Sequence, residues 1–315
     1  MSGPIDKRLL FVTGKGGVGK TTIAAALGLA AARQGKRTIV CEVAQQERMS
    51  RAFRREGVGW SETELADHLY AISIDPHQSL EEYLEDQIGS RRLAHLLFRN
   101  RIFDYFAAAA PGVRELVTIG KVWELAQLER RRASDTPYDL VIVDAPATGH
   151  GLATLRAPRT FGNIASAGVI ARQAGRIDSF ITDSEQTGVV VVALPEEMPV
   201  NETVEFRARL AAEMGMTIDA VVVNGLFPER FTSEDAERIE AVNGGHGHEA
   251  VAAALRSALW EHHRARDQRA QLRRLKRELG GNGDGAPVVT LPYLFEPELG
   301  LDAFERLSDE LGRKL

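Results

Sequence analysis

The chain has 315 residues, of which 44% are hydrophobic and 26% are charged, and its formal net charge is −5. This composition excludes a disordered protein and fits about two domains, or one large α/β domain with an insertion. The acidic balance argues against binding nucleic acid through bulk positive charge, and we expect no nucleic-acid partner. The single cysteine, Cys41, excludes an intrachain disulfide and a metal site built from several of the chain's own thiolates.

No segment predicts export or membrane insertion. Residues 1–8 are polar, and the apolar run Leu9–Val12 is too short for the core of a signal peptide. The alanine-rich stretch Ile23–Ala32 is bounded by Lys20 and Arg33, so it cannot span a bilayer. We therefore expect a cytoplasmic protein with no direct membrane span.

Short β-branched segments alternate with helical patterns along the chain. Their near-continuous apolar character is typical of strands buried on both faces of a parallel sheet. The predicted strands are Leu9–Thr13, Thr38–Val43, Tyr70–Ile74, Leu140–Asp144, Val189–Leu194, Ala220–Asn224 and Val288–Leu291. Helices are predicted at Thr21–Gln34, Asn201–Glu213 and Pro297–Leu311. The alternation predicts an α/β protein with a doubly wound, mainly parallel sheet.

Two helical stretches interrupt this alternation. We expect an inserted helical subdomain at roughly 77–137 and a second helical segment at roughly 160–187, within one domain that spans residues 1–315. An arginine-rich helix is predicted at Leu255–Leu279. Because acidic residues interrupt its basic ones, we expect that helix to be solvated.

A phosphate-binding loop is predicted between the first strand and the first helix. Gly14–Thr21 fits the pattern G-x-x-x-x-G-K-[ST], in which backbone N–H groups surround phosphates at a helix N-terminus. Lys20 can reach the β- and γ-phosphates, and the Thr21 hydroxyl can ligate Mg²⁺. The predicted nucleotide-binding residues of the loop are Gly14, Gly16, Gly17, Val18, Gly19, Lys20, Thr21 and Thr22.

The loop also begins with a second lysine, Lys15, which marks the deviant Walker A form. In families with this form, the early lysine reaches the nucleotide of the partner subunit. The predicted strand that ends at Asp144 is the Walker B arrangement, in which the carboxylate holds Mg²⁺ together with Thr21. The segment Ala145–Gly151 contains glycines that allow a nucleotide-dependent switch, and within it His150 is expected to form hydrogen bonds rather than act as a base.

The order of the motifs resembles the arsenite-transporting and tail-anchored-protein-targeting ATPases, the ArsA-type family of the MinD/ParA class. The motifs are the deviant loop at 14–22, Ile74–Pro76, Asp144–His150, Leu194–Pro199, Val221–Asn224 and Leu291–Tyr293. The resemblance implies an ATPase that uses ATP and Mg²⁺, either as a homodimer or as a heterodimer with a paralogous ATPase. It also implies catalytic roles for Lys15, Lys20 and Asp144.

The resemblance further implies an adenine contact from Asn224, with backbone near Pro292 and Tyr293 closing over the base. The alternative for Asn224 is a buried residue that caps a turn at the end of its strand.

The segment after the second strand departs from the family pattern. The family has Asp-Pro-Ala-His there, with an aspartate that positions the attacking water, whereas this chain has Ala44, Gln45, Gln46 and Glu47. Glu42 or Glu47 could replace the carboxylate, or Glu42 could simply end its strand. Two hypotheses follow: a switch ATPase with weak turnover, or an ATP-binding regulatory or assembly subunit that pairs with an active paralogue or holds a client.

The cargo is not specified by the sequence. Arsenite binding and a zinc-linked dimer both require more cysteines than Cys41, and so does an iron–sulfur reductase. A group of apolar residues in the insert predicts either packing against the sheet or a surface for a protein client or partner subunit. Its members are Leu93, Leu96, Leu97, Phe98, Ile102, Phe103, Tyr105 and Phe106, followed by Leu116, Val117, Ile119, Val122, Trp123 and Leu125.

Overall fold

The computed structural model describes residues 3–43, 48–55, 57–88, 112–129, 136–165, 168–243, 249–280, 285–296 and 299–315. Its strands form one sheet in the order β3-β4-β2-β5-β1-β6-β7-β8. The strands are β1 (Leu9–Gly14), β2 (Thr38–Val43), β3 (Thr63–Ala66), β4 (Leu69–Ile74), β5 (Leu140–Ala147), β6 (Thr187–Ala193), β7 (Ala220–Leu226) and β8 (Val288–Pro292). All neighbouring pairs are parallel except β3 and β4, which are antiparallel.

All seven predicted strands are present, and β3 was not predicted. That strand is short and half-exposed, and Glu64 interrupts its apolar residues. It pairs with β4 through a tight turn in which His68 has a φ of 59°. Because an edge strand needs only one covered face, its sequence lacks the continuous apolar run that marks the buried strands.

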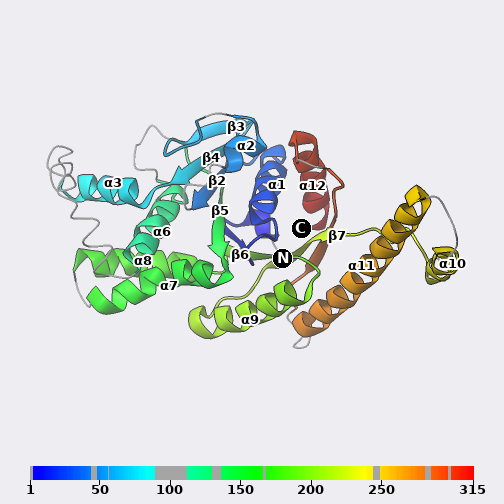
Figure 1. The fold of residues 1–315 in the computed structure, drawn as a ribbon. Helices are drawn as coiled ribbons and strands as arrows, with labels where there is room; N and C mark the ends of the chain where they lie inside the picture. Colours follow the sequence, from blue (N-terminus) through cyan, green and yellow to red (C-terminus); the bar gives the residue numbers. More distant parts are fainter. Residues whose placement is uncertain are drawn as a thin grey trace.

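Helices cover both faces of the sheet (Figure 1), as expected for a doubly wound fold. Alternate residues of each strand point to opposite faces, so Leu9 and Phe11 join one core while Leu10 and Val12 join the other. The second core contains α1 (Lys20–Arg33), α2 (Arg48–Ala52) and α12 (Leu301–Lys314). The first contains α6 (Val113–Leu125), α7 (Thr148–Ala165), α8 (Val169–Thr182), α9 (Glu197–Met214) and α11 (Glu249–Gly280).

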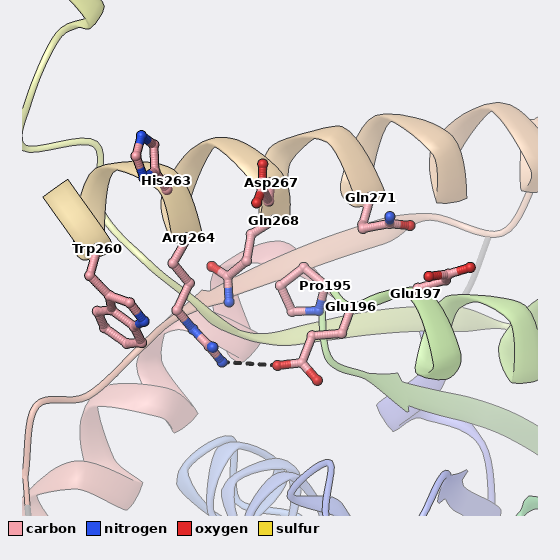
Figure 2. Close-up of a pocket in the computed structure, with 9 residues that line it drawn as sticks. All are labelled: Pro195, Glu196, Glu197, Trp260, His263, Arg264, Asp267, Gln268 and Gln271. Carbon is pink, nitrogen blue, oxygen red and sulfur yellow. Dashed lines mark hydrogen bonds and ion pairs between the residues drawn. The ribbon is translucent and has the colours of Figure 1, made fainter. Parts of the chain in front are cut away.

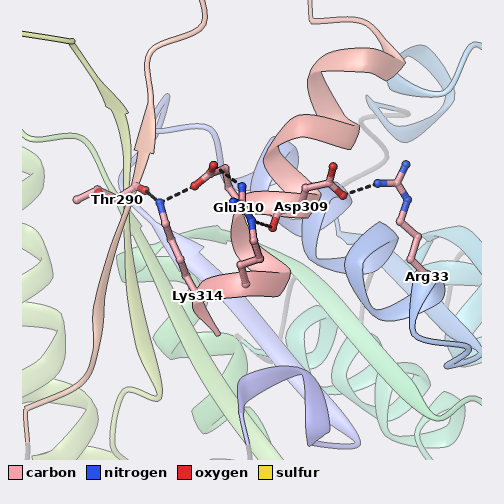
Figure 3. Close-up of polar contacts among 6 residues, drawn as sticks. Arg33, Thr290, Asp309, Glu310 and Lys314 are labelled. Carbon is pink, nitrogen blue, oxygen red and sulfur yellow. Dashed lines mark hydrogen bonds and ion pairs between the residues drawn. The ribbon is translucent and has the colours of Figure 1, made fainter.

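The C-terminal helix α12 is fastened to α1 and to the sheet by polar contacts (Figure 3). Arg33 of α1 pairs with Asp309 at 2.8 Å. Lys314 donates to the carbonyl of Thr290 on β8 at 3.0 Å and pairs with Glu310 at 2.6 Å. The C-terminal helix α12 therefore packs beside α1 and completes the layer of helices on that face of the sheet. Helix α12 begins at Leu301, four residues later than the sequence predicts.

The predicted insert contains α3 (Pro76–Ile88) and α6 within its described residues. Lys121 of α6 is largely buried and pairs with Glu82 of α3 and with Glu124, each at 3.0 Å. Burial opposes the charge of this ammonium group, but the two carboxylates outweigh burial and raise the pKa of Lys121. A buried, paired lysine thus joins α3 to the helix that packs on the sheet.

The apolar group at Leu93–Phe106 lies outside the described residues, so its role stays a prediction. In α6, by contrast, Ile119, Val122 and Leu125 are buried in the first core. The second predicted helical segment corresponds to the end of α7 and to α8. Among the described helices, none combines the length and the apolar character needed to cross a membrane.

The arginine-rich helix α11, preceded by α10 (Ser233–Asn243), is not simply solvated. Leu275 and Leu279 are buried in the first core. Arg264 and Arg269 form ion pairs with acidic residues outside the helix, Glu196 and Glu229, each at 2.9 Å. These two arginines and the buried leucines therefore hold the helix against the rest of the protein.

Candidate functional site

The predicted phosphate loop lies between the end of β1 and the start of α1, at the carboxyl edge of the sheet. Gly14 ends β1, where a Cβ atom would collide with the carbonyl oxygen of Val192 on β6. Gly19 caps α1 with a φ of 92°, and a Cβ there would lie 2.5 Å from the side-chain nitrogen of Asn224. Between them, Gly16 and Gly17 are exposed while Val18 is buried. The loop thus combines a buried anchor with an accessible backbone.

Lys20, Thr21 and Asp144 come together at this loop. The Lys20 ammonium group donates to the carbonyl of Lys15 at 3.1 Å, so its side chain folds back over the loop. The Thr21 hydroxyl donates to Asp144 Oδ2 at 2.6 Å, which joins the first turn of α1 to β5. Thr22, the next residue of α1, is half-buried.

The Thr21–Asp144 pair provides two hard oxygen donors. Mg²⁺ in nucleotide sites is held by one or two protein oxygens, with phosphate oxygens and water completing its shell. The donor set therefore fits that ion. Within the part of the chain that the structure describes, no group of three or more His, Cys, Asp or Glu residues could hold a metal.

Lys15 forms an ion pair with a residue that the sequence did not single out, Glu202 of α9. The other carboxylate oxygen of Glu202 accepts a hydrogen bond from the Thr148 hydroxyl at 3.3 Å. Thr148 directly follows β5 and lies four residues after Asp144. One carboxylate thus connects the early lysine of the loop to the predicted switch segment. The only sequence signal for it was the motif Leu194–Pro199, which leads into α9.

Glu42 lies beside Asp144 in the register of β2 and β5, but it is only 1% exposed. Its Oε1 atom accepts the backbone N–H of Met49 at 3.1 Å, near the start of α2. Ala44 and Glu47 lie outside the described residues. The observed contact of Glu42 therefore secures the segment that returns to the sheet after β2, and its catalytic role stays a prediction.

The ends of β7 and β8 bring the predicted adenine contacts next to the loop. Asn224 on β7 donates to the carbonyl of Val18 at 3.0 Å. Pro292 ends β8 opposite Leu226 on β7, and the Tyr293 N–H donates to the Leu226 carbonyl at 2.9 Å. Tyr293 remains 43% exposed. Residues that are about 200 positions apart therefore share one edge of the sheet.

Comparison with known proteins identifies the class to which this fold and site belong. Residues 7–173 and 163–244 match the sequence model of the family described as Anion-transporting ATPase. The chain belongs to this family, the ArsA-type ATPases, and the resemblance seen in its motifs is confirmed. Membership of the family supports ATP binding and nucleotide-dependent ATPase activity.

Several relatives carry names consistent with that family. The chain is 30% identical to "ATPase BagA" of Mycobacterium tuberculosis, over 80% of this chain and 74% of that protein. It is 30% identical to a "Putative arsenical pump-driving ATPase" of Halobacterium salinarum, over 72% of this chain and 37% of that protein. It is 27% identical to "ATPase get3" of Pyrenophora tritici-repentis, over 70% of this chain and 61% of that protein.

Proposed function

We propose that the protein is a cytoplasmic switch ATPase that binds Mg·ATP and works as a dimer, either with itself or with a paralogous ATPase. The observation that carries this proposal is the 2.6 Å contact between the Thr21 hydroxyl and Asp144. It joins the phosphate loop to the carboxylate of the neighbouring strand, the pair that P-loop ATPases use around Mg²⁺.

The phosphates of ATP lie along the loop in this proposal. The exposed backbone at Gly16 and Gly17, together with the N-terminus of α1, favours bound negative charge. Lys20 leaves the Lys15 carbonyl and binds the β- and γ-phosphates. Thr21 and Asp144 hold Mg²⁺, which when bound neutralises charge on the phosphate oxygens.

Asn224, Pro292 and Tyr293 face the base in this proposal. Asn224 is already hydrogen-bonded to the loop. A movement of Asn224 when the base binds would therefore also move the loop that holds the phosphates. We expect loss of the γ-phosphate to change the position of Asp144 and then that of Thr148, which follows the same strand. The switch segment would pass that change to α9 through Glu202.

Lys15 is proposed to stabilise charge on the nucleotide of the partner subunit. Its ion pair with Glu202 holds the ammonium group at the rim of the loop in a single subunit. The names of the relatives, one a pump-driving ATPase and one a get3 ATPase, favour coupling of nucleotide state to a partner. We place a protein client on the helical insert at roughly 77–137.

A second candidate function is an ATP-binding regulatory or assembly subunit with little hydrolysis of its own. The observation that favours it is Ala44, which stands where the family has its water-positioning aspartate. The buried state of Glu42 and its bond to Met49 also make that residue a poor replacement. Both candidates share the same nucleotide site and differ in turnover.

Steady-state phosphate release with Mg·ATP separates the two candidates. We expect a low rate in the wild type, loss of that rate in Lys20→Ala, and a higher rate in Ala44→Asp. ATP binding without phosphate release above the Lys20→Ala background, together with release in Ala44→Asp, would support the regulatory subunit. Wild-type release that Lys20→Ala leaves unchanged would rule out hydrolysis at this loop.

A further inference from the structure

Helix α11 is anchored near its middle to the end of the strand that carries Asn224. Gln268, which is 4% exposed, accepts the Phe227 N–H at 2.8 Å and donates to the Gly225 carbonyl at 3.2 Å. Asn224, immediately before Gly225, donates to the phosphate loop. Helix α11 is therefore connected to the nucleotide site through one strand end.

An aromatic cluster surrounds the end of this strand. Phe227 is buried at its centre, with Tyr293 stacked on it at a ring distance of 4.4 Å. Trp260 of α11 and Phe295 meet the Phe227 ring edge-on, at 5.7 and 5.5 Å. The three outer residues, Trp260, Tyr293 and Phe295, are each between 43% and 57% exposed. Exposed large apolar side chains that cluster in this way mark a binding surface.

A cavity of about 410 Å³ lies between α11 and the turn after β6. Its wall includes Trp260, Arg264 and Gln268 from α11, and Pro195 and Glu196 from the turn (Figure 2). Small-molecule sites have this size and this mixture of aromatic walls with a few fixed polar groups. In open α/β sheets, ligands bind in the crevice outside the carboxyl ends of the strands, where this cavity lies.

Arg264 is held in a defined position in that wall. Its guanidinium pairs with Glu196 at 2.9 Å, and in Figure 2 it reaches across the cavity beside Trp260. The same group lies 5.2 Å from the Phe227 ring and 5.4 Å from the Trp260 ring. A flat cation fixed next to the exposed ring of Trp260 forms a surface on which a planar heteroaromatic ring can stack.

We propose that Trp260 and Arg264 form a stacking wall for the base of the nucleotide, beside Tyr293. This inference rests on the proposed function, because the phosphate loop must hold the same ligand. Aromatic and arginine side chains stack on bases through the π-face, so the wall supplies affinity for the base while the loop supplies affinity for the phosphates. Trp260 then determines how much more tightly the protein binds ATP than a bare polyphosphate.

Tryptophan fluorescence tests the position of the base. The chain has three tryptophans, and Trp60 and Trp123 lie in other parts of the structure, near β3 and in α6. We expect ATP to quench the wild-type fluorescence and tripolyphosphate to leave it unchanged. The ATP-dependent quenching should disappear in Trp260→Phe and persist in the matched control Trp123→Phe. Quenching that persists in Trp260→Phe would overturn the proposal.

Calorimetric binding tests the energetic role of the wall. Trp260→Ala should raise the Kd for ATP by about tenfold or more and leave the Kd for tripolyphosphate unchanged. Equal weakening of both ligands would assign Trp260 a merely structural role and overturn the proposal. Wild-type affinity for ATP in Trp260→Ala would also overturn the proposal. The exposed aromatic cluster would then be assigned to the binding of a protein partner.

Lys20→Ala separates failure of this inference from failure of the proposed function. That variant should weaken ATP and tripolyphosphate alike, whatever Trp260 does. If Lys20→Ala leaves both affinities unchanged, the phosphate loop is not the ligand site, and both proposals fail together. If Lys20→Ala weakens both ligands while Trp260→Ala changes neither, only the stacking wall fails.

Discussion

Lys15, Glu202 and Thr148 come from the phosphate loop, from α9 and from the segment after β5, and they meet at two contacts. Lys15 and Glu202 are each about 30% exposed, so their ion pair contributes little to stability, on the order of 1 kcal/mol or less. Its significance is positional, since it keeps a flexible lysine at the rim of the phosphate loop. In the proposed dimer, this lysine stabilises charge during hydrolysis and contributes little to binding within its own subunit.

Replacing Lys15 should therefore separate binding from turnover. Lys15→Ala should keep the Kd for ATP near the wild-type value and lower phosphate release by about a hundredfold or more. Lys20→Ala, by comparison, should lose both. Calorimetry and a phosphate-release assay on the same preparations measure the two effects. A Lys15→Ala protein with wild-type turnover would show that the lysine does not act on a nucleotide.

Gly19 combines a left-handed backbone with a close neighbour, because a Cβ would lie 2.5 Å from the Asn224 side chain. Gly19→Ala should raise the Kd for ATP at least tenfold, since backbone strain of about 1–3 kcal/mol and the collision both distort the loop. Gly35→Ala is the matched control, with a φ of 82° and open space around it. It should cost stability but preserve ATP affinity. Equal ATP affinity in both variants would contradict this role of Gly19.

At the scale of elements, α1 depends on close contact with the sheet. A Cβ at Gly28 would lie 2.9 Å from a methyl of Val40 on β2 and 3.0 Å from one of Leu69 on β4. The glycine thus lets a mostly alanine helix lie close to the strands, and it positions the phosphate loop at the N-terminus of that helix. Overpacking at such a contact is destabilising because the core has no spare volume.

Gly28→Val should lower the free energy of unfolding by about 1–3 kcal/mol. Gly312→Ala in α12 is the matched control, because its Cβ would meet Ala30 at an ordinary 3.8 Å. That control should raise the free energy of unfolding by up to about 1 kcal/mol through helix propensity. Denaturant titration of both variants gives the comparison. A stabilised Gly28→Val protein would show that α1 can move away from the sheet.

The elements that the sequence predicts well are those marked by local pattern. The phosphate loop, its helix and the strand before Asp144 each fill a short stretch with a fixed spacing. The edge strand β3 lacked that pattern because it needs burial on one side only. The role of α11 could not be predicted, because two of its arginines, Arg264 and Arg269, find acidic partners on other elements through tertiary packing rather than through helical spacing.

The same distinction applies to the site. Thr21 and Asp144 could be paired from sequence because both belong to motifs with known positions at strand ends. Glu202 and Trp260 could not, since neither lies within a motif and both contact residues that are distant in sequence. The sequence therefore predicted the contact between the phosphate loop and β5 better than the contacts around it.

On the scale of the whole molecule, the sheet brings the site together. The strand order sets β1 between β5 and β6, with β7 and β8 beyond, so residues from both ends of the chain share one edge. The loop after β1, Asp144 on β5 and Asn224 on β7 meet there through side-chain contacts. That one domain spans residues 1–315 stays a prediction, and this interleaving of strands favours it.

The most direct test is the affinity for ATP measured by calorimetry with Mg²⁺ and with EDTA, in the wild type and in Asp144→Asn. If Thr21 and Asp144 hold Mg²⁺ against the phosphates, the ion should tighten ATP binding in the wild type and have little effect in Asp144→Asn. Both conditions should show weak binding in Lys20→Ala. Equal wild-type affinity in Mg²⁺ and EDTA, or undiminished binding by Lys20→Ala, would contradict a Mg·ATP site at this loop.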